Sequence, residues 1–158
     1  MKKSRSACPS NSKALGLALQ ALTILADQRC RHASSHLADH LASEPTLIRR
    51  ILARLAQVDI LEVREGRDGG YSLKRSPASV TCADVYRALH IGDPFCDGLL
   101  DSAEEQPLGA RMQEALSDIA GEVNQAVERA LEQYTIADLV NKLDYRIDKH
   151  NESGIYCD

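Results

Sequence analysis

A glycine-rich segment at residues 64–77, REGRDGGYSLKRSP, constrains the fold of this chain more than any other stretch. It contains three of the nine glycines and four of the 19 lysines and arginines. A Walker-type phosphate loop is excluded, because its glycines must lead directly into a lysine and a serine or threonine on the first turn of a helix. A dinucleotide-binding loop is excluded too, because GRDGGY lacks both the G-x-G-x-x-G spacing and a following helix.

The segment instead predicts a tight β-hairpin. Apolar and polar residues alternate on both sides of the glycines, in ILEVR at 60–64 and YSLKR at 71–75, which is typical of strands. Asp68 and Gly69 are a favoured pair for a tight turn whose two central residues both have positive φ. The edges of the hairpin carry four basic side chains: Arg64, Arg67, Lys74 and Arg75.

Two short helices are predicted before the hairpin. Ser34 is a candidate N-cap for the first, which runs through Leu41. Ser43 is a candidate N-cap for the second, whose first turn tolerates Pro45. The second helix has an apolar stripe at helical spacing, formed by Ile48, Ile51, Leu52 and Leu55. Its opposite face is polar and basic and contains Thr46, Arg50, Ala53 and Gln57, flanked by Arg49 and Arg54. This division predicts a helix-turn-helix, and the hairpin after it predicts a wing.

The remaining helices are predicted from their apolar spacing and caps. A largely apolar helix is expected at 13–26, and Thr81 and Thr135 can cap two short helices. We therefore expect a mainly α fold: a winged helix-turn-helix domain with a two-stranded β wing and a long C-terminal dimerisation helix. The expected organisation is a flexible N-terminus at 1–11, the winged helix-turn-helix domain at 12–91, a linker at 92–107, the long helix and final short helix at 108–143, and a flexible tail at 144–158.

The long helix, expected at 108–134, carries a heptad seam. Its members alternate steps of four and three residues and are Met112, Leu116, Ile119, Val123, Ala126 and Ala130. Such a seam on a single amphipathic helix predicts pairing with a second copy of the chain, and packing within the same chain is the alternative. No internal repeat is visible.

Charge is distributed unevenly along the chain. Residues 1–76 contain 13 Lys/Arg and 7 Asp/Glu, which gives +6, whereas residues 77–158 contain 6 and 16, which gives −10. The asymmetry indicates that the N-terminal half meets a polyanion, although two differently solvated surfaces would give the same counts.

The stretch from Ser43 to Leu89 resembles the Rrf2 family of bacterial winged-helix transcriptional regulators, which includes IscR, NsrR and CymR. The shared pattern is Gly-x-x-Gly-Gly-Tyr-x-Leu-x-Arg at 66–75, followed by Val-Thr-x-x-Asp-Val at 80–85. The resemblance extends over roughly residues 12–143. It implies a homodimeric regulator, most often a repressor, with double-stranded DNA as its partner. A winged-helix module that binds protein is the alternative.

In such a dimer the second helix of the helix-turn-helix enters the major groove, and the wing reaches the minor groove or the backbone. The residues expected at the DNA are Ser34, Thr46, Leu47, Arg49, Arg50, Arg54, Arg64, Arg67, Gly69 and Gly70. Many relatives place an arginine just before the first glycine of the wing, where this chain has Glu65. We therefore expect Arg64 or Arg67 to make the wing contact. For each arginine, a solvated surface charge is the alternative.

The five cysteines are odd in number and irregularly spaced, so they predict no disulfide framework. Cluster-binding relatives have three close cysteines before the long helix, where this chain has only Cys96, so an iron–sulfur cluster would need unusual ligands such as His90 or a group from the partner subunit. A thiol switch is the favoured form of sensing. Its candidates are Cys30, which lies between two arginines that favour a thiolate, together with Cys96 and Cys8; inert thiols are the alternative.

No arrangement of residues points to catalysis or to a resident metal. His36 and His40 are one helical turn apart, which can seat a metal, but no third ligand is evident beside them. A solvated or phosphate-facing pair is therefore expected. The chain has neither a secretory signal pattern nor an apolar run of the ~18 residues that a membrane helix needs, so a cytoplasmic location is expected.

Overall fold

The computed structural model describes residues 11–28, 31–89, 109–143 and 155–156. The elements follow in the order α1 (Asn11–Gln28), β1 (Arg31–His32), α2 (Ser34–His40), α3 (Pro45–Gln57), β2 (Leu61–Arg64), β3 (Gly70–Leu73), η1 (Pro77–Ser79), α4 (Cys82–Ala88), α6 (Gly109–Glu132), α7 (Ile136–Leu143) and β4 (Ile155–Tyr156). The predicted mainly helical, winged-helix fold is confirmed. In the described part of the chain, no helix combines the length and apolarity needed to cross a membrane.

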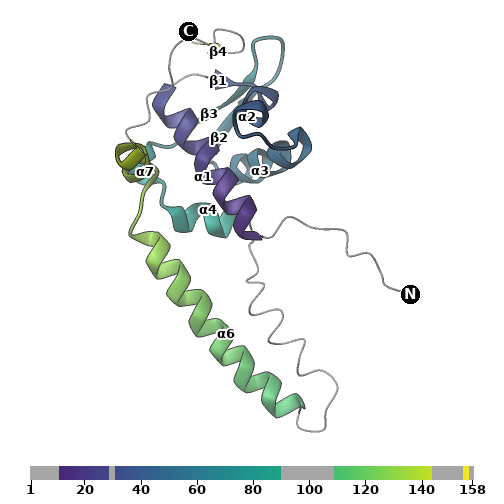
Figure 1. Cartoon of the computed structure of the whole chain (residues 1–158), viewed down its shortest axis with the longest axis vertical. Helices are drawn as coiled ribbons and strands as arrows, with labels where there is room; N and C mark the ends of the chain where they lie inside the picture. The colour runs from purple at the N-terminus through teal and green to yellow at the C-terminus, as the bar shows by residue number, and fades with distance from the viewer. Residues whose placement is uncertain (1–10, 29–30, 90–108, 144–154, 157–158) are drawn as a thin grey trace, which may run out of the picture.

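The core forms around α1, which lies between α3 and α7 (Figure 1). Leu22 and Leu25 of α1 are at most 1% exposed, as expected for a helix that is apolar on most sides. The predicted stripe of α3 is buried against it, with all four residues at most 3% exposed. Ile136 of α7 is fully buried in the same core. The final short helix therefore packs with the winged-helix domain, although the long helix precedes it in the chain.

Two helices begin with the caps that the sequence predicts. Thr81 and Asp84 form a reciprocal capping box at α4, and Thr135 and Asp138 do the same at α7. The two caps are joined, because Thr81 and Thr135 form an antiparallel bridge and the Cys82 amide donates to the Tyr134 carbonyl at 2.8 Å. This bridge returns the chain from the end of α6 to the domain.

The predicted caps of α2 and α3 are wrong. Ala33 and Glu44 occupy the cap positions, and neither helix has a side-chain cap. Ser34 is already helical because β1 places Ala33 in extended backbone directly after the strand. Ser43 belongs to the turn between the helices, where its amide donates to the Ala38 carbonyl at 3.0 Å.

The wing is an antiparallel hairpin of β2 and β3, as predicted, with Leu61 opposite Leu73 and Arg64 opposite Gly70. It belongs to a larger sheet in the order β2-β3-β1-β4. Strands β1 and β4 are two residues long, too short to show an alternating pattern in the sequence. Strand β4 places Ile155–Tyr156, from the tail expected to be flexible, beside β1; residues 144–154 and 157–158 lie outside the described residues.

The predicted turn conformation is wrong. Positive φ falls on Gly66 (109°) and Gly70 (151°) and not on the Asp68–Gly69 pair. Five residues, 65–69, separate the strands, so the loop is longer than a two-residue turn. Within it, the Gly69 amide donates to the Gly66 carbonyl at 3.1 Å, which leaves Arg67 and Asp68 as the central residues of the turn.

Gly70→Ala is expected to destabilise the domain by about 2–5 kcal/mol, because backbone strain and a steric clash combine. A Cβ at this position would lie 2.7 Å from the carbonyl oxygen of His32, a backbone atom of β1 that cannot rotate away. Urea unfolding measures the loss. Gly66→Ala is the matched control: φ is also positive there, but a Cβ would meet no atom of the described residues within 4 Å, so a smaller loss is expected. Equal losses would refute the steric contribution.

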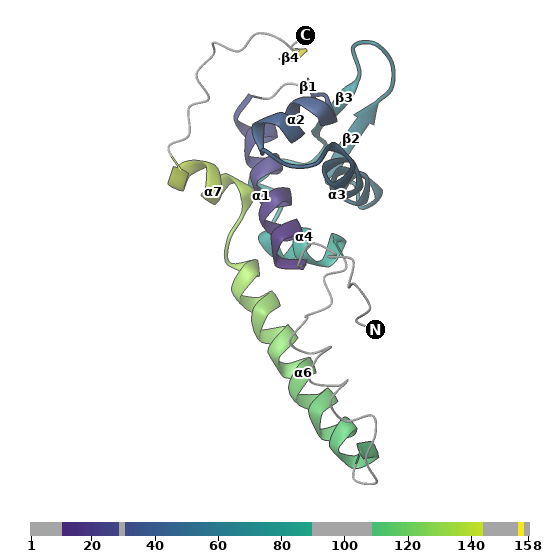
Figure 2. The ribbon, with the colours of Figure 1, turned by 45° about the vertical axis from the view of Figure 1, so that its right-hand side comes forward.

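Helix α6 is an arm that extends away from the rest of the domain (Figures 1 and 2). The part of it nearest α7 packs beside α4, where Ala120 is 7% exposed. Two apolar side chains of the predicted seam are exposed, Met112 at 43% and Ile119 at 49%, and Leu116 and Val123 are half-buried. On the helix, the seam lies on a different face from Asn124, which contacts Tyr86 of α4.

Candidate nucleic-acid interface

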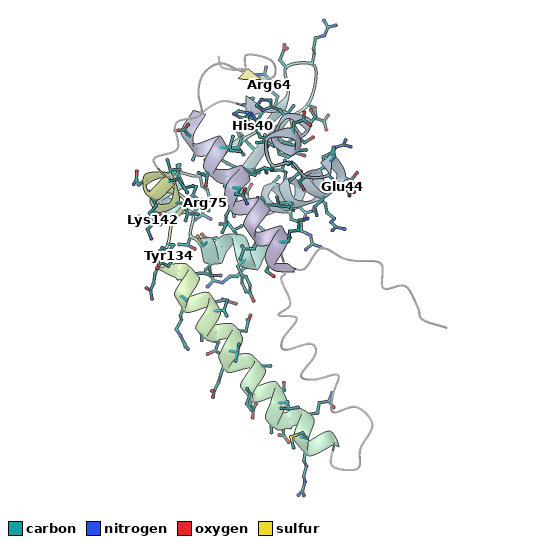
Figure 3. The ribbon with its side chains drawn as sticks, in the orientation of Figure 1. His40, Glu44, Arg64, Arg75, Tyr134 and Lys142 are labelled. Atoms are coloured by element: carbon teal, nitrogen blue, oxygen red, sulfur yellow. The ribbon has the colours of Figure 1, made fainter. Side chains whose placement is uncertain are left out.

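Helix α3 and the wing lie on the same side of the domain, with the hairpin loop extending beyond the helices (Figures 1 and 2). The outward face of α3 is exposed at Thr46, Arg49, Arg50, Ala53 and Gln57. Glu44, at the start of α3, lies on the edge of the same side (Figure 3). The fold thus places a helix with two exposed arginines beside a projecting hairpin, an arrangement that fits the major groove and the flanking backbone of a duplex.

Two candidate residues of α3 have contacts inside the chain. Leu47 is half-buried and packs against the core. The guanidinium of Arg54 donates to the Leu89 carbonyl at the end of α4. This contact engages Arg54 within the domain, so the exposed basic face of α3 consists of Arg49 and Arg50. Ser34, in the first turn of α2, is half-buried.

The four basic residues of the hairpin segment divide into two groups. Arg64 and Arg67 are exposed on the wing itself. Lys74 forms an ion pair of 2.6 Å with Asp59, and Arg75 donates to the Ser79 carbonyl and lies 3.3 Å from a carboxylate oxygen of Asp84. Figure 3 places Arg75 toward α7, far from Arg64 beside the wing. Lys74 and Arg75 therefore have partners within the domain.

An ion pair that the sequence gives no reason to expect fixes the base of the wing. Arg31 of β1 donates to Glu62 of β2 at 2.9 Å, and the Ser72 hydroxyl of β3 donates to the same carboxylate oxygen at 2.9 Å. Arg31 and Glu62 are 31 residues apart, so no local pattern could have joined them. Together these contacts link three strands and limit rotation of the hairpin on the domain.

Three histidines form a cluster where β1 meets α2. His32 is fully buried, and its Nδ1 lies 3.1 Å from Nδ1 of His36. The His36 ring in turn packs edge-on against that of His40, with centroids 4.5 Å apart. The Nε2 atoms of His32 and His36 are buried, and neither has a hydrogen-bond partner among the residues that the structure describes. Of the pair expected to be solvated or phosphate-facing, His40 is exposed, whereas His36 is half-buried because the fold brings His32 against it.

The histidine cluster predicts a loss of stability in acid. Burial, and then the charges of His36 and His40, lower the pKa of His32 from 6.5 to about 4. Burial also lowers the pKa of His36. Above pH 6.5 His32 is neutral in both states; below it, the unfolded chain takes up the proton first, so unfolding becomes more favourable until the pH nears 4.

We expect the free energy of unfolding to fall by about 2–3 kcal/mol between about pH 7 and pH 4.5 from this source, measured by urea titration at each pH. His32→Leu removes the buried titrating group and is expected to flatten the profile over this range. Parallel profiles for the wild type and His32→Leu would show that other groups cause the loss.

Among the residues that the structure describes, no three His, Cys, Asp or Glu side chains are grouped so as to hold a metal ion. Cys82 is a buried free thiol, and burial raises its pKa, so it is not a reactive cysteine. The cysteines proposed for sensing, Cys8, Cys30 and Cys96, lie outside the described residues. His90, the possible unusual ligand of a cluster, lies outside them as well.

Comparison with known proteins places this arrangement in a family. A model of the Rrf2 family, described as "Iron-dependent Transcriptional regulator", matches residues 11–142. A Bacillus subtilis (strain 168) protein named "Putative HTH-type transcriptional regulator YwnA" is 29% identical over 129 residues, which cover 82% of this chain and 96% of that protein.

Two solved structures have the same fold. One, titled "Crystal structure of a putative DNA binding protein", is 29% identical with a TM-score of 0.65, covering 81% of this chain and 99% of that one. The other, IscR of T. potens, is 18% identical with a TM-score of 0.59, covering 90% of this chain and 88% of that one. The chain belongs to the Rrf2 family of winged-helix transcriptional regulators.

Proposed function

We propose that this protein is a homodimeric repressor that binds double-stranded DNA through α3 and the wing and dimerises through α6. The observation that carries the proposal is the exposed basic face of α3 beside a hairpin whose base is fixed by Arg31 and Glu62. Repression follows if a bound dimer occupies DNA that the transcription machinery needs.

The exposed side chains of α3 suit base and backbone contacts. Arg49 or Arg50 can donate two hydrogen bonds to a guanine, and Thr46 can contact a thymine methyl or a phosphate. Arg64 and Arg67 on the wing can reach the neighbouring minor groove or backbone. Gly69 and Gly70, which the sequence also predicts at the DNA, are needed inside the chain instead, because a Cβ there would meet backbone atoms of Arg64 and His32. Glu65 is an exposed acid beside these arginines, so only the two arginines are assigned to the phosphates.

The seam of α6 supports the dimer. Exposed Met112 and Ile119 would lose contact with water against the same residues of a second copy, whereas the described part of this chain leaves them uncovered. A two-fold axis at the arm places two copies of α3 on the DNA, and it predicts an operator with two inverted half-sites. Outside the seam, the surface of α6 carries several acidic residues, in contrast to the basic face of α3. Because these acids would repel the phosphates of DNA, the partner of α6 is expected to be a protein.

Control by cysteine oxidation is part of the proposal. Since Cys82 is buried with a raised pKa, the thiols that would respond are among the other four, Cys8, Cys30, Cys96 and Cys157. Cys30 lies two residues before His32, close in sequence to the base of the wing, where a change of its charge or bonding would reach the DNA-binding surface.

Selection of genomic fragments by the purified protein, once reduced and once mildly oxidised, tests the function. The reduced protein is expected to enrich fragments that share an inverted repeat, with an affinity that falls steeply as salt is raised. Enrichment that differs between the reduced and the oxidised protein supports control by thiol oxidation. Equal enrichment of the two contradicts that control. No enrichment in either state, at low and moderate salt, would refute DNA binding and leave a protein-binding module.

A further inference from the structure

Helix α4 joins the DNA-facing elements to the arm. Its inner face is anchored in the core by Val85, which is fully buried. At its C-terminal end, the Leu89 carbonyl accepts from Arg54 of α3. In its first turn, Asp84 is paired with Arg75, which lies just after β3. The recognition helix and the exit of the wing are therefore both fixed to α4.

The outer side of α4 is fixed to α6 by a polar network. Nε of Arg87 donates to Glu128 at 2.7 Å, and an Nη of Arg87 donates to Glu132, one helical turn farther along α6. The Tyr86 hydroxyl donates to Asn124 Oδ1 at 2.8 Å, and the amide of Asn124 donates to Glu128 at 3.2 Å. The contacts span about two turns of α6 and involve all five side chains in one connected set.

This network restrains orientation more than it stabilises the fold. The Arg87 side chain is 44% exposed, and ion pairs in such positions contribute little to folding. The guanidinium of Arg87, however, is planar and holds its N–H donors in fixed directions. It can therefore bind both Glu128 and Glu132, one turn apart, only when α4 and α6 cross at a particular angle. The Tyr86 ring is buried, with 6% exposed, and holds the hydroxyl in place.

We propose that Arg87 and Tyr86 are positioning residues that set the distance between the two DNA-reading surfaces of the dimer and hence the half-site spacing that the protein prefers. The inference rests on the proposed function. Helix α6 has 24 residues and is about 36 Å long. The contact with α4 centres on Glu128, about 28 Å from the start of α6, so a tilt of roughly 10° there would move that far end by about 5 Å, roughly one and a half base-pair steps.

The test uses duplexes built from the sequence that the wild-type protein selects from a random pool, with the two half-sites moved apart or together one base pair at a time. The wild type is expected to prefer one spacing over its neighbours by about tenfold or more. Arg87→Ala is expected to bind the preferred spacing about 5–10-fold more weakly and its neighbours almost equally well, whereas binding to a single half-site stays within about twofold. Tyr86→Phe keeps the buried ring and removes the hydroxyl, so a smaller change in the same direction is expected.

Arg129→Ala is the matched control, since it removes an exposed arginine from another face of α6 and is expected to keep the wild-type spacing profile. Thermal unfolding and sedimentation establish that each variant is a folded dimer; if Arg87→Ala is not, Tyr86→Phe decides. An unchanged spacing profile, or an equal loss on single and paired half-sites, overturns the inference and leaves the proposed function intact. If the wild type selects no sequence, the proposed function fails, and the inference fails with it.

Discussion

Arg50→Ala is expected to weaken binding to the selected operator by about 1–3 kcal/mol, or roughly 5–150-fold, and to relax the base preference at one position of each half-site. Arg50 is exposed on the outward face of α3, while the stripe that holds this helix in the domain faces the core. Removing the guanidinium therefore costs DNA contacts and leaves the packing unchanged. Arg49→Ala is expected to act in the same way, and the double variant should lose sequence-specific binding.

Titration of labelled duplexes at several salt concentrations separates the two kinds of contact. A residue that reads a base alters the preference among sequences, whereas one that meets a phosphate lowers the affinity for all sequences and reduces the salt slope by about one. Lys74→Ala is the control, because Lys74 is paired with Asp59 away from the tip of the wing. This substitution should leave the affinity for the operator nearly unchanged. Unchanged operator affinity at moderate salt for both arginine variants would contradict the assignment of α3.

Ile119→Glu is expected to convert the dimer into a folded monomer at micromolar concentration and to lower operator affinity by about 10²–10⁴-fold. Ile119 is 49% exposed in the single chain, so the carboxylate costs little there. In a dimer it would be buried against the seam of the second copy without a partner, which is strongly unfavourable. The monomer would bind each half-site separately and would lose the higher affinity that comes from binding both half-sites at once.

Sedimentation equilibrium gives the mass of each variant, and duplexes with one or two half-sites give the affinities. Gln125→Glu introduces the same charge on the face of α6 opposite the seam, so it should remain a dimer with wild-type affinity. A dimeric Ile119→Glu would show that the seam is not the interface. A monomer that binds the full operator as tightly as the wild type would show that dimerisation is not needed for recognition.

Features that depend on residues near one another in sequence were predictable. The buried stripe of α3, the capping boxes of α4 and α7 and the strands of the wing all follow from spacing over a few residues. The start of α3 was missed because two local signals compete: Ser43 is a good cap, but Pro45 at the first helical position moves the cap to Glu44. The turn was missed because φ can be positive at any of the three glycines, and the length of the loop decides which.

The sequence by itself determined the main helices, the two strands of the wing, the buried face of α3 and the family, because helical and strand periodicity and the spacing of the wing motif are local properties. Only the tertiary structure decided which charged side chains remain exposed for a ligand. Arg54 meets a carbonyl 35 residues away, and Arg87 meets carboxylates 41 and 45 residues away. A long side chain can bind any partner within its reach, and the packing of the chain determines which partners lie there. Arg49, Arg50, Arg54 and Arg75 are the same residue type in the sequence, but the packing engages the last two inside the domain.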